Sequence, residues 1–471
     1  MTPEEFRRLG HQIVDWVADY RERAASLPVM SRVAPGDIKA QLPASPPQSP
    51  EGFDAVLRDL DQVIVRGLSH WQHPRFFGYF PSNGELSSVL GDYLSTGLGV
   101  LGLSWQSSPA LTEVEEVVTD WMRQMVGLSD AWSGVIQDTA SSCTLVALIC
   151  ARERSSGFSL ASRGLQGEAA PLVVYVSAHS HSSVEKAALL AGFGRANIHV
   201  VPTDARYAMQ PGALAQAVRD DLTAGRRPCA VVATCGTTAT TAFDPLESIA
   251  AVAAEHGLWM HVDAAMAGSA MILPECRPLW AGIEGADSLV MNPHKWLGVA
   301  FDCSLYYVRD PQHLVRVMST NPSYLQSAVD SRVKNLRDWG IPLGRRFRAL
   351  KLWCLIREQG VEGLQRRLRR DLDNARWLEV QVRGEPHWRV LAPVALQTLC
   401  VCHEPPGLEG EALDRHTLSW AERVNTSGEA YVTPAVLDGR WMVRLSVGSL
   451  TTEREHVAAL WDLLRAEATR T

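Results

Sequence analysis

The chain has 471 residues, of which 46% are hydrophobic and 21% charged, and its formal net charge is −7. This length exceeds one ordinary domain and allows a large buried core with one or two smaller lobes. The densest basic stretch is LQRRLRRDLDNAR from Leu364, which interleaves Asp with Arg. We expect it to form a solvated helix face. The composition therefore argues against nucleic-acid binding.

The N-terminal pattern and the cysteines indicate where the protein resides. Residues 1–23, MTPEEFRRLGHQIVDWVADYRER, predict an amphipathic helix and not a signal peptide, because no basic start precedes an apolar core. No segment reaches the roughly 18 consecutive apolar residues that a membrane span needs. The nine cysteines lie mostly in apolar runs such as LVALIC and QTLCVC, which favours reduced, buried thiols. We therefore expect a cytoplasmic protein without a membrane partner.

The order of patterns along the chain predicts three zones. Residues 1–85 hold helical patterns separated by the proline-rich LPASPPQSP, and we expect this segment to embrace another subunit. In residues 86–345, β-branched runs alternate with helical patterns, which predicts an α/β fold with a mainly parallel sheet covered by helices. The strand runs are 172–177, 197–202, 229–234, 258–263, 288–292 and 303–308, and the helical patterns between them are 181–192, 210–225 and 245–257. Residues 346–471 begin with a long helix and continue as an α+β lobe with antiparallel strands.

Polar residues that follow the predicted strands are the candidates for a ligand site, because open α/β sheets bind ligands beyond the carboxyl ends of their strands. In VIQDTASSCTLVALICARER, Asp138 to Ser142 precede a clear helical pattern, and Ala140, Ser141 and Ser142 would present backbone N–H groups and hydroxyls at its N-terminus. The amides and dipole of such a helix start can bind a phosphate. Ordinary capping by serine is the alternative.

Asp263 and two histidines come after further strands. Asp263 ends the run LWMHVD and is followed by small residues. Its carboxylate could pair with a pyridinium nitrogen or cap the next helix. His179 and His181 are two residues apart, but no third ligand follows at a spacing that suits zinc, and we predict no metal site. An imidazole that stacks on a ring or donates a proton fits better.

Lys295 stands in MNPHKWLG, inside an apolar run that is otherwise nearly free of cations. Burying an ammonium group is costly unless it is paired or neutralised. A lysine in a dry site has a lowered pKa and can form a Schiff base with an aldehyde, whereas a lysine that reaches the surface is the alternative. A phosphate-binding helix start, a ring-stacking histidine, a carboxylate for a ring nitrogen and a Schiff-base lysine together predict pyridoxal 5′-phosphate (PLP).

The motifs NPHKW, HVDAAMAGSA, HSSVEKA, SWQSSPALTEVEE and IPLGRRFRALKLW resemble those of the group II PLP-dependent decarboxylases, and most closely the aromatic L-amino-acid decarboxylases. The resemblance covers nearly the whole chain. It implies the fold-type I architecture of PLP-dependent enzymes and an obligate homodimer with shared active sites. It also implies decarboxylation of DOPA, tyrosine, phenylalanine, tryptophan or 5-hydroxytryptophan to the amine and CO₂.

The same resemblance assigns roles to particular positions. It makes Lys295 the Schiff-base lysine, places Asp263 at the pyridine nitrogen, and makes His181, not His179, the ring-stacking histidine. The other cofactor contacts that it implies are Ala140, Ser141, Thr238, Ala265, Asn292 and His294. The substrate-pocket residues that it implies are Trp71, Tyr79, Phe80, Pro81, Leu103, Phe301 and Leu336. Core packing is the alternative for so many aromatic residues, but SHWQHPRFFGYFPSNG offers no spare cation for a glutamate side chain, so we expect an aromatic substrate.

One position departs from the family pattern. The segment YLQSAVDSRVKNLRDW, residues 324–339, is polar and lacks a firm period, which predicts a mobile loop. The resemblance implies a tyrosine in this loop that returns a proton to Cα after CO₂ leaves, and Leu336 stands at that place. Tyr324 is the only tyrosine in the segment, and His181 is the other candidate donor. The alternative product is an aldehyde with ammonia and peroxide, as in an aromatic acetaldehyde synthase.

Overall fold

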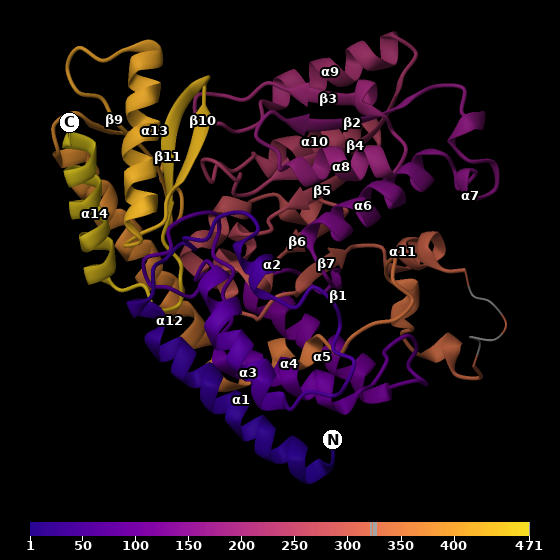
Figure 1. The fold of residues 1–471 in the computed structure, drawn as a ribbon. Helices are drawn as coiled ribbons and strands as arrows, with labels where there is room; N and C mark the ends of the chain where they lie inside the picture. Colours follow the sequence, from indigo (N-terminus) through magenta and orange to yellow (C-terminus); the bar gives the residue numbers. More distant parts are fainter. Residues whose placement is uncertain (321–322, 324–326, 471) are drawn as a thin grey trace. The chain divides into compact units, whose positions relative to one another are not determined.

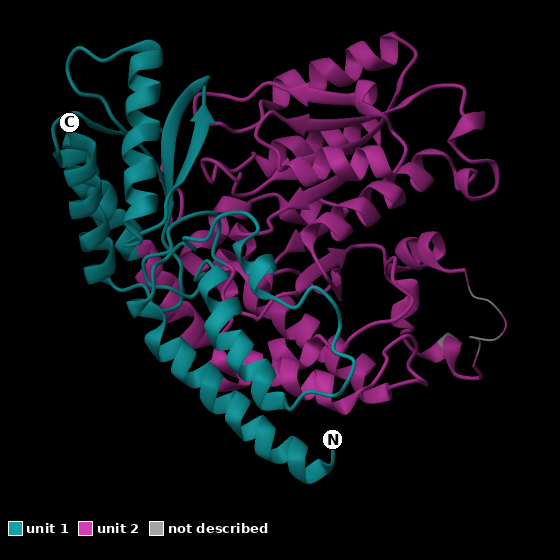
Figure 2. Cartoon of the chain, viewed as in Figure 1, with its two compact units in different colours: residues 1–81, 373–391, 399–471 teal, residues 82–372, 392–398 magenta. Residues whose placement is uncertain are grey.

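The computed structural model describes residues 1–320, 323 and 327–470. The chain divides into two compact units (Figure 2). One unit comprises residues 1–81, 373–391 and 399–471, and the other comprises residues 82–372 and 392–398. The N-terminal zone and most of the C-terminal zone thus fall in the first unit, while the predicted zone boundaries at 85 and 345 remain predictions.

The larger unit, residues 82–372 and 392–398, is built on a seven-stranded sheet in the order β1-β7-β6-β5-β4-β2-β3 (Figure 1). The strands are β1 (Ser133–Gln137), β2 (Leu172–Ser177), β3 (Ile198–Val201), β4 (Arg227–Thr234), β5 (Trp259–Asp263), β6 (Ser288–Met291) and β7 (Ser304–Val308). Strand β7 runs antiparallel to both of its neighbours, and the other neighbouring pairs are parallel. The predicted mainly parallel α/β sheet is confirmed.

Helices connect the strands of this sheet and follow the predicted patterns closely. They are α6 (Ala140–Ser155), α8 (Ser182–Leu190), α9 (Pro211–Thr223), α10 (Leu246–His256) and α11 (Pro311–Met318), preceded by α4 (Leu86–Leu98) and α5 (Pro109–Val126). Helix α10 ends at Gly257, which adopts φ 67°, a left-handed conformation that glycine reaches without strain. Every residue of β2 and β5 is buried, as expected of a parallel sheet covered on both faces.

The smaller unit combines the N-terminal helices with a four-stranded sheet in the order β10-β11-β9-β8. Its main elements are α1 (Pro3–Arg23), α2 (Asp37–Gln41), α3 (Phe53–Asp59), β8 (Trp388–Val390), β9 (Thr398–His403), α13 (Gly410–Ser427), β10 (Thr433–Leu437), β11 (Arg440–Ser446) and α14 (Arg454–Thr469). Thr2 and Glu5 form a capping box that starts α1. The pairs β10–β11 and β8–β9 are antiparallel, so the α+β character predicted for the C-terminal zone is confirmed.

Helix α12 (Ala349–Gly384) contains the stretch that we expected to be solvated, and that expectation is wrong in part. The Arg366 side chain is 73% exposed, but Arg367 is only 9% exposed and Asp371 is completely buried. Buried charges are tolerated when they are paired and hydrogen-bonded, and both of these side chains have such partners.

The cysteines are all free thiols, and each of them except Cys354 is buried. Among the helices in the described part of the chain, none has the length and apolarity that a membrane crossing requires.

Candidate active site

Lys295 lies in a distorted turn directly after β6. Residues Pro293–Leu297 form a single π-helical turn, in which Lys295 has φ −98° and ψ −109°, outside helical values. Gly298 closes the turn at φ 93° and donates its N–H to the carbonyl of Pro293. Distorted turns of this kind cluster at functional sites, and here the distortion falls on the lysine that the sequence analysis selects.

Asp263 lies at the carboxyl end of the neighbouring strand β5 and is 4% exposed. Its Oδ1 accepts the N–H of Ala265 at 3.0 Å. The carbonyl of Ala265 in turn accepts the N–H of Asn292 at 2.9 Å. These bonds align the segments that follow β5 and β6, so Asp263, Ala265 and Asn292 meet at one edge of the sheet.

Ser304, which the sequence analysis missed, joins two parts of this edge. It begins β7, is completely buried, and lies opposite Gln137 of β1. Its hydroxyl is 2.6 Å from Oδ1 of Asn292 and 3.2 Å from the carbonyl oxygen of Asp138. Because β7 is inserted between β1 and β6, this one side chain connects the start of α6 with the residue before the lysine turn.

Helix α6 begins at Ala140, and its first backbone amides are the candidate anion site. Its N-cap residue, Thr139, makes no side-chain capping bond, and the Thr139 N–H donates to Oδ1 of Asp138 at 2.8 Å. The N-cap position is thus held by Thr139 and not by one of the serines that we considered as capping residues. Ala140 is buried and Ser141 is exposed, and the amides of such a helix start favour a phosphate through their direction and the helix dipole.

His181 precedes α8 and interacts electrostatically with both Asp263 and Lys295. Burial is the main cause that lowers its pKa below the usual 6.5, and Lys295 lowers it further while Asp263 acts in the opposite direction. Its Nδ1 accepts the N–H of Ser183 at 3.2 Å, so the proton of the neutral ring is assigned to Nε2. His179 instead packs edge-on against Tyr207, with ring centroids 5.2 Å apart.

His294, the residue before the lysine, is held as a neutral imidazole. It is 4% exposed, and its Nδ1 accepts the N–H of Cys303 at 2.9 Å. Burial and, next, the charge of Lys295 lower its pKa to about 3. Its Nε2–H is therefore the nitrogen that can donate to a phosphate oxygen. Phe301 lies beside this ring, with centroids 4.8 Å apart, and is 61% exposed.

The remaining predicted residues of the larger unit are placed as follows. Leu336 is 1% exposed, and the next residue, Arg337, donates its N–H to the carbonyl of Leu103 at 3.0 Å. The structure thus brings Leu103 next to the segment that holds Leu336 and Arg337. Thr238 is exposed on the loop after β4, and Tyr324 lies outside the described residues.

Four of the predicted pocket residues belong to the smaller unit. There, Trp71 stacks on Tyr79 with ring centroids 5.5 Å apart. The guanidinium of Arg444 lies 4.1 Å from the ring centroid of Phe80, and Pro81 is buried. Their assignment to the walls of a substrate pocket remains a prediction.

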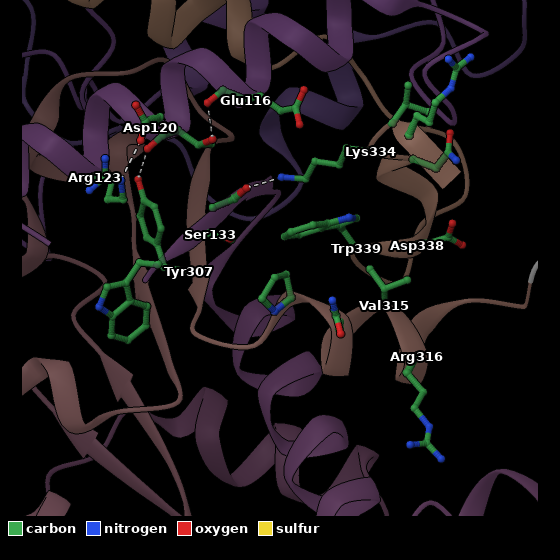
Figure 3. Close-up of a pocket in the computed structure, with 18 of the residues that line it drawn as sticks. Glu116, Asp120, Arg123, Ser133, Tyr307, Val315, Arg316, Lys334, Asp338 and Trp339 are labelled. Atoms are coloured by element: carbon green, nitrogen blue, oxygen red, sulfur yellow. Dashed lines mark hydrogen bonds and ion pairs between the residues drawn. The ribbon is translucent and has the colours of Figure 1, made fainter. Parts of the chain in front are cut away.

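A separate cavity of about 850 Å³ lies at the other edge of the seven-stranded sheet (Figure 3). Ser133 at the start of β1 and Tyr307 near the end of the antiparallel β7 line it, which places it at the amino ends of the parallel strands. In Figure 3, Lys334 extends across the face of Trp339, with its Nζ 3.6 Å from the ring centroid and 2.6 Å from the carbonyl of Gly134. Ligands of open α/β sheets bind at the opposite, carboxyl edge, so this cavity is not the cofactor site.

The residues at the carboxyl edge fit pyridoxal 5′-phosphate. The open start of α6 and the Nε2–H of His294 suit its phosphate, and the buried carboxylate of Asp263 suits its ring nitrogen. Lys295, on its distorted turn, would supply the amine for its aldehyde. The fold and this group of residues define a PLP-dependent enzyme of fold-type I.

Comparisons with known proteins identify the family. The model of the pyridoxal-dependent decarboxylase conserved domain matches residues 35–403. Tryptophan decarboxylase 2 of Oryza sativa subsp. japonica is 40% identical over 480 residues, which cover 100% of this chain and 96% of the relative. Phenylacetaldehyde synthase of Arabidopsis thaliana is 40% identical over 478 residues, covering 99% and 96%. The solved structure of Oryza sativa TDC with PLP and tryptamine matches with a TM-score of 0.96 at 38% identity, covering 100% of this chain and 98% of that one.

The chain therefore belongs to the pyridoxal-dependent decarboxylase family, as a PLP-dependent carboxy-lyase of its aromatic amino-acid decarboxylase group. The resemblance inferred from the sequence motifs is confirmed, and so is the cofactor.

Proposed function

We propose that the protein converts aromatic L-amino acids to the corresponding amine and CO₂. The observation that carries this proposal is the placement of Asp263 at the end of β5 and of Lys295 on the distorted turn after the neighbouring strand β6. Both charges act on His181. When bound, PLP supplies the ring that accepts the electrons of the bond between Cα and the carboxylate. Asp263 holds a proton at the ring nitrogen, Lys295 supplies the amine that holds the cofactor and then releases the product, and His181 carries a proton on Nε2.

Aromatic substrates are supported by the relatives, which include tryptophan and tyrosine decarboxylases. The candidates are DOPA, tyrosine, phenylalanine, tryptophan and 5-hydroxytryptophan. In an apolar pocket, one methylene or hydroxyl changes selectivity by only about 1–3 kcal/mol, so single side chains decide among them. We assign that selection to Trp71, Tyr79, Phe80, Pro81, Leu103, Phe301 and Leu336.

A second candidate function rests on Leu336. A leucine side chain has no proton to return to Cα, and relatives at 40% identity include a phenylacetaldehyde synthase. In that reaction one amino acid, one O₂ and one water give CO₂, an aldehyde, ammonia and one peroxide. The two candidate functions therefore share every step up to the loss of CO₂ and differ in what then reaches Cα, a proton or oxygen.

One experiment distinguishes them. The purified holoenzyme is incubated in air with each of the five amino acids, and CO₂, amine, aldehyde and peroxide are quantified. Amine equal to CO₂ supports the decarboxylase, and aldehyde and peroxide equal to CO₂ support the synthase. Lys295→Ala should abolish turnover in either case, and turnover that persists in this variant would overturn both. Leu336→Tyr should raise the amine-to-aldehyde ratio if the side chain at position 336 determines the product.

We also propose that the protein acts as a homodimer. Helix α4 exposes a row of leucines at four-residue spacing, Leu86, Leu90, Leu94 and Leu98. Such spacing places them on one helix face, and a continuous exposed apolar surface of this kind marks an interface. A Leu90→Asp, Leu94→Asp double variant should sediment as a monomer, whereas a wild-type chain that sediments as a monomer would refute the dimer. A cytoplasmic location remains our expectation, supported by the free, buried thiols.

A further inference from the structure

The two residues that follow Lys295 are bound by a single buried guanidinium. Arg367 donates from Nη1 to the carbonyl of Trp296 at 2.9 Å and from Nη2 to the carbonyl of Leu297 at 2.5 Å. Arg367 is 9% exposed, and its Nε lies 3.6 Å from Oε1 of Glu85. Because the turn ends at Gly298, no following helical turn supplies N–H donors to these carbonyls, and the guanidinium takes that place.

Asp371, one helical turn further along α12, binds the side chain of the same residue. Its Oδ2 accepts the indole N–H of Trp296 at 2.9 Å, and both side chains are completely buried. Arg370 donates to the other carboxylate oxygen at 3.1 Å. Residues four apart lie on the same helix face, so Arg367 and Asp371 together bind the backbone and the side chain of Trp296.

Helix α4 completes the attachment from a second direction. The N–H of Glu85 donates to the carbonyl of Gly298 at 2.8 Å. The hydroxyl of Ser88 accepts the N–H of Ala300 at 2.8 Å. The backbone from Trp296 to Ala300 is therefore bonded to two helices, and Arg367 is linked to both through Glu85.

Burying the charged groups of Arg367 and Asp371 costs free energy, so stability alone is a poor explanation for them. Burial lowers the pKa of Arg367 and raises that of Asp371 to about 6, so each charged form is disfavoured where it lies. Replacing a buried ion pair by apolar residues is often neutral or stabilising. An arginine also constrains geometry, because the N–H groups of its planar guanidinium fix the positions of two acceptors at once.

We propose that Arg367 and Asp371 are positioning residues that hold the Lys295 turn in the geometry the reaction needs. They act through Trp296 and Leu297 and not on the cofactor. This inference rests on the proposed function, because it assigns a role to the two residues through Lys295. If the turn were not held in place, the amine of Lys295 would be misplaced. Both the attachment of the cofactor and each turnover would then be slower.

The test compares Arg367→Met, Arg367→Lys and Asp371→Asn with the control Arg369→Met. Arg369 stands on the same helix and binds Glu275 at 2.7 Å with both side chains well exposed. For each apoprotein, the rate of covalent attachment of pyridoxal 5′-phosphate to Lys295 is followed by visible absorbance. The kcat and KM per bound cofactor and the thermal midpoint of the apoprotein are then measured.

Arg367→Met should slow attachment and kcat by about 10- to 100-fold, because misplacing a reacting group by an ångström costs this much. KM should change less than about threefold, since the substrate is not what these residues bind. Arg367→Lys should recover part of the loss by donating to one carbonyl. Asp371→Asn keeps an oxygen for the indole and should lose less than Arg367→Met. The control should behave as wild type.

The outcomes separate this inference from the proposed function. Wild-type protein that never attaches the cofactor to Lys295 overturns both. Wild-type attachment combined with Arg367 variants that keep attachment rate and kcat within about twofold of wild type, and lose only thermal stability, overturns the positioning role alone. If Arg367→Met does not fold, Arg367→Lys and Asp371→Asn decide by the same criteria.

Discussion

Replacing Ser304 by alanine should weaken cofactor binding more than it weakens the fold. The hydroxyl is completely buried and lies 2.6 Å from Oδ1 of Asn292 and 3.2 Å from the carbonyl of Asp138. Ser304→Ala leaves these acceptors without that donor, which costs about 1–3 kcal/mol. Since Asp138 leads into the start of α6, we expect much of this loss in the binding of the phosphate. Expressed as affinity, it corresponds to a rise in Kd of up to roughly 100-fold.

The assay is titration of the apoprotein with pyridoxal 5′-phosphate, combined with urea unfolding of the same apoprotein. Ser288→Ala is the matched control, because Ser288 is also completely buried and lies 2.9 Å from both the indole nitrogen of Trp259 and Nδ1 of His261. It stands at the amino end of β6, away from the start of α6. Equal Kd values in the two variants would refute the reasoning, even if both are destabilised.

Three further predictions concern buried ionisable groups. Lys351→Met removes a completely buried ammonium group that lies 3.3 Å from the carboxylate of Asp92 and 3.9 Å from that of Asp302. The free energy of unfolding, measured in urea, should fall by about 2–4 kcal/mol. Adding Asp92→Asn should restore part of this loss. His294 has its pKa lowered from 6.5 to about 3, so the unfolded chain gains a proton first and stability should fall as pH drops below 6.5. A His294→Gln variant should show a shallower fall in its urea midpoint, and an unchanged slope would contradict this. Glu115→Gln leaves Arg345, 2.7 Å away and buried, without a counter-charge and should cost about 3–5 kcal/mol, checked by the same unfolding measurement.

Local patterns predicted the elements and the residues that follow them. The run 258–263 became β5 at Trp259–Asp263, and the pattern 245–257 became α10 at Leu246–His256. Alternation of β-branched runs with helical periods is a local property of the chain, so these elements could be found without knowing how they pair. Asp263 was identified because it ends such a run, and Lys295 because it lies three residues after another, 288–292.

Contacts between distant segments could not be predicted in this way. Ser304 joins Asp138 and Asn292 only because β7 is inserted antiparallel between β1 and β6. The order of strands in a sheet cannot be predicted from the sequence of any single strand. Arg367 was misinterpreted as solvated for a related reason. Its acceptors lie 71 and 70 residues away in the chain, whereas the stretch around it is rich in the arginines typical of an exposed helix.

Contacts between distant segments hold the backbone around Lys295. A lysine that holds a cofactor must release it to the substrate and take it back, so its side chain has to move while its backbone stays in place. Several of the bonds described above fall on residues near Lys295: those of Arg367 on the carbonyls of Trp296 and Leu297, that of Asp371 on the indole of Trp296, and that of Ser304 on Asn292. If Lys295 has the role that we propose, a turn held in place by these bonds would return its amine to one position at each cycle, and orientation would then contribute to the rate.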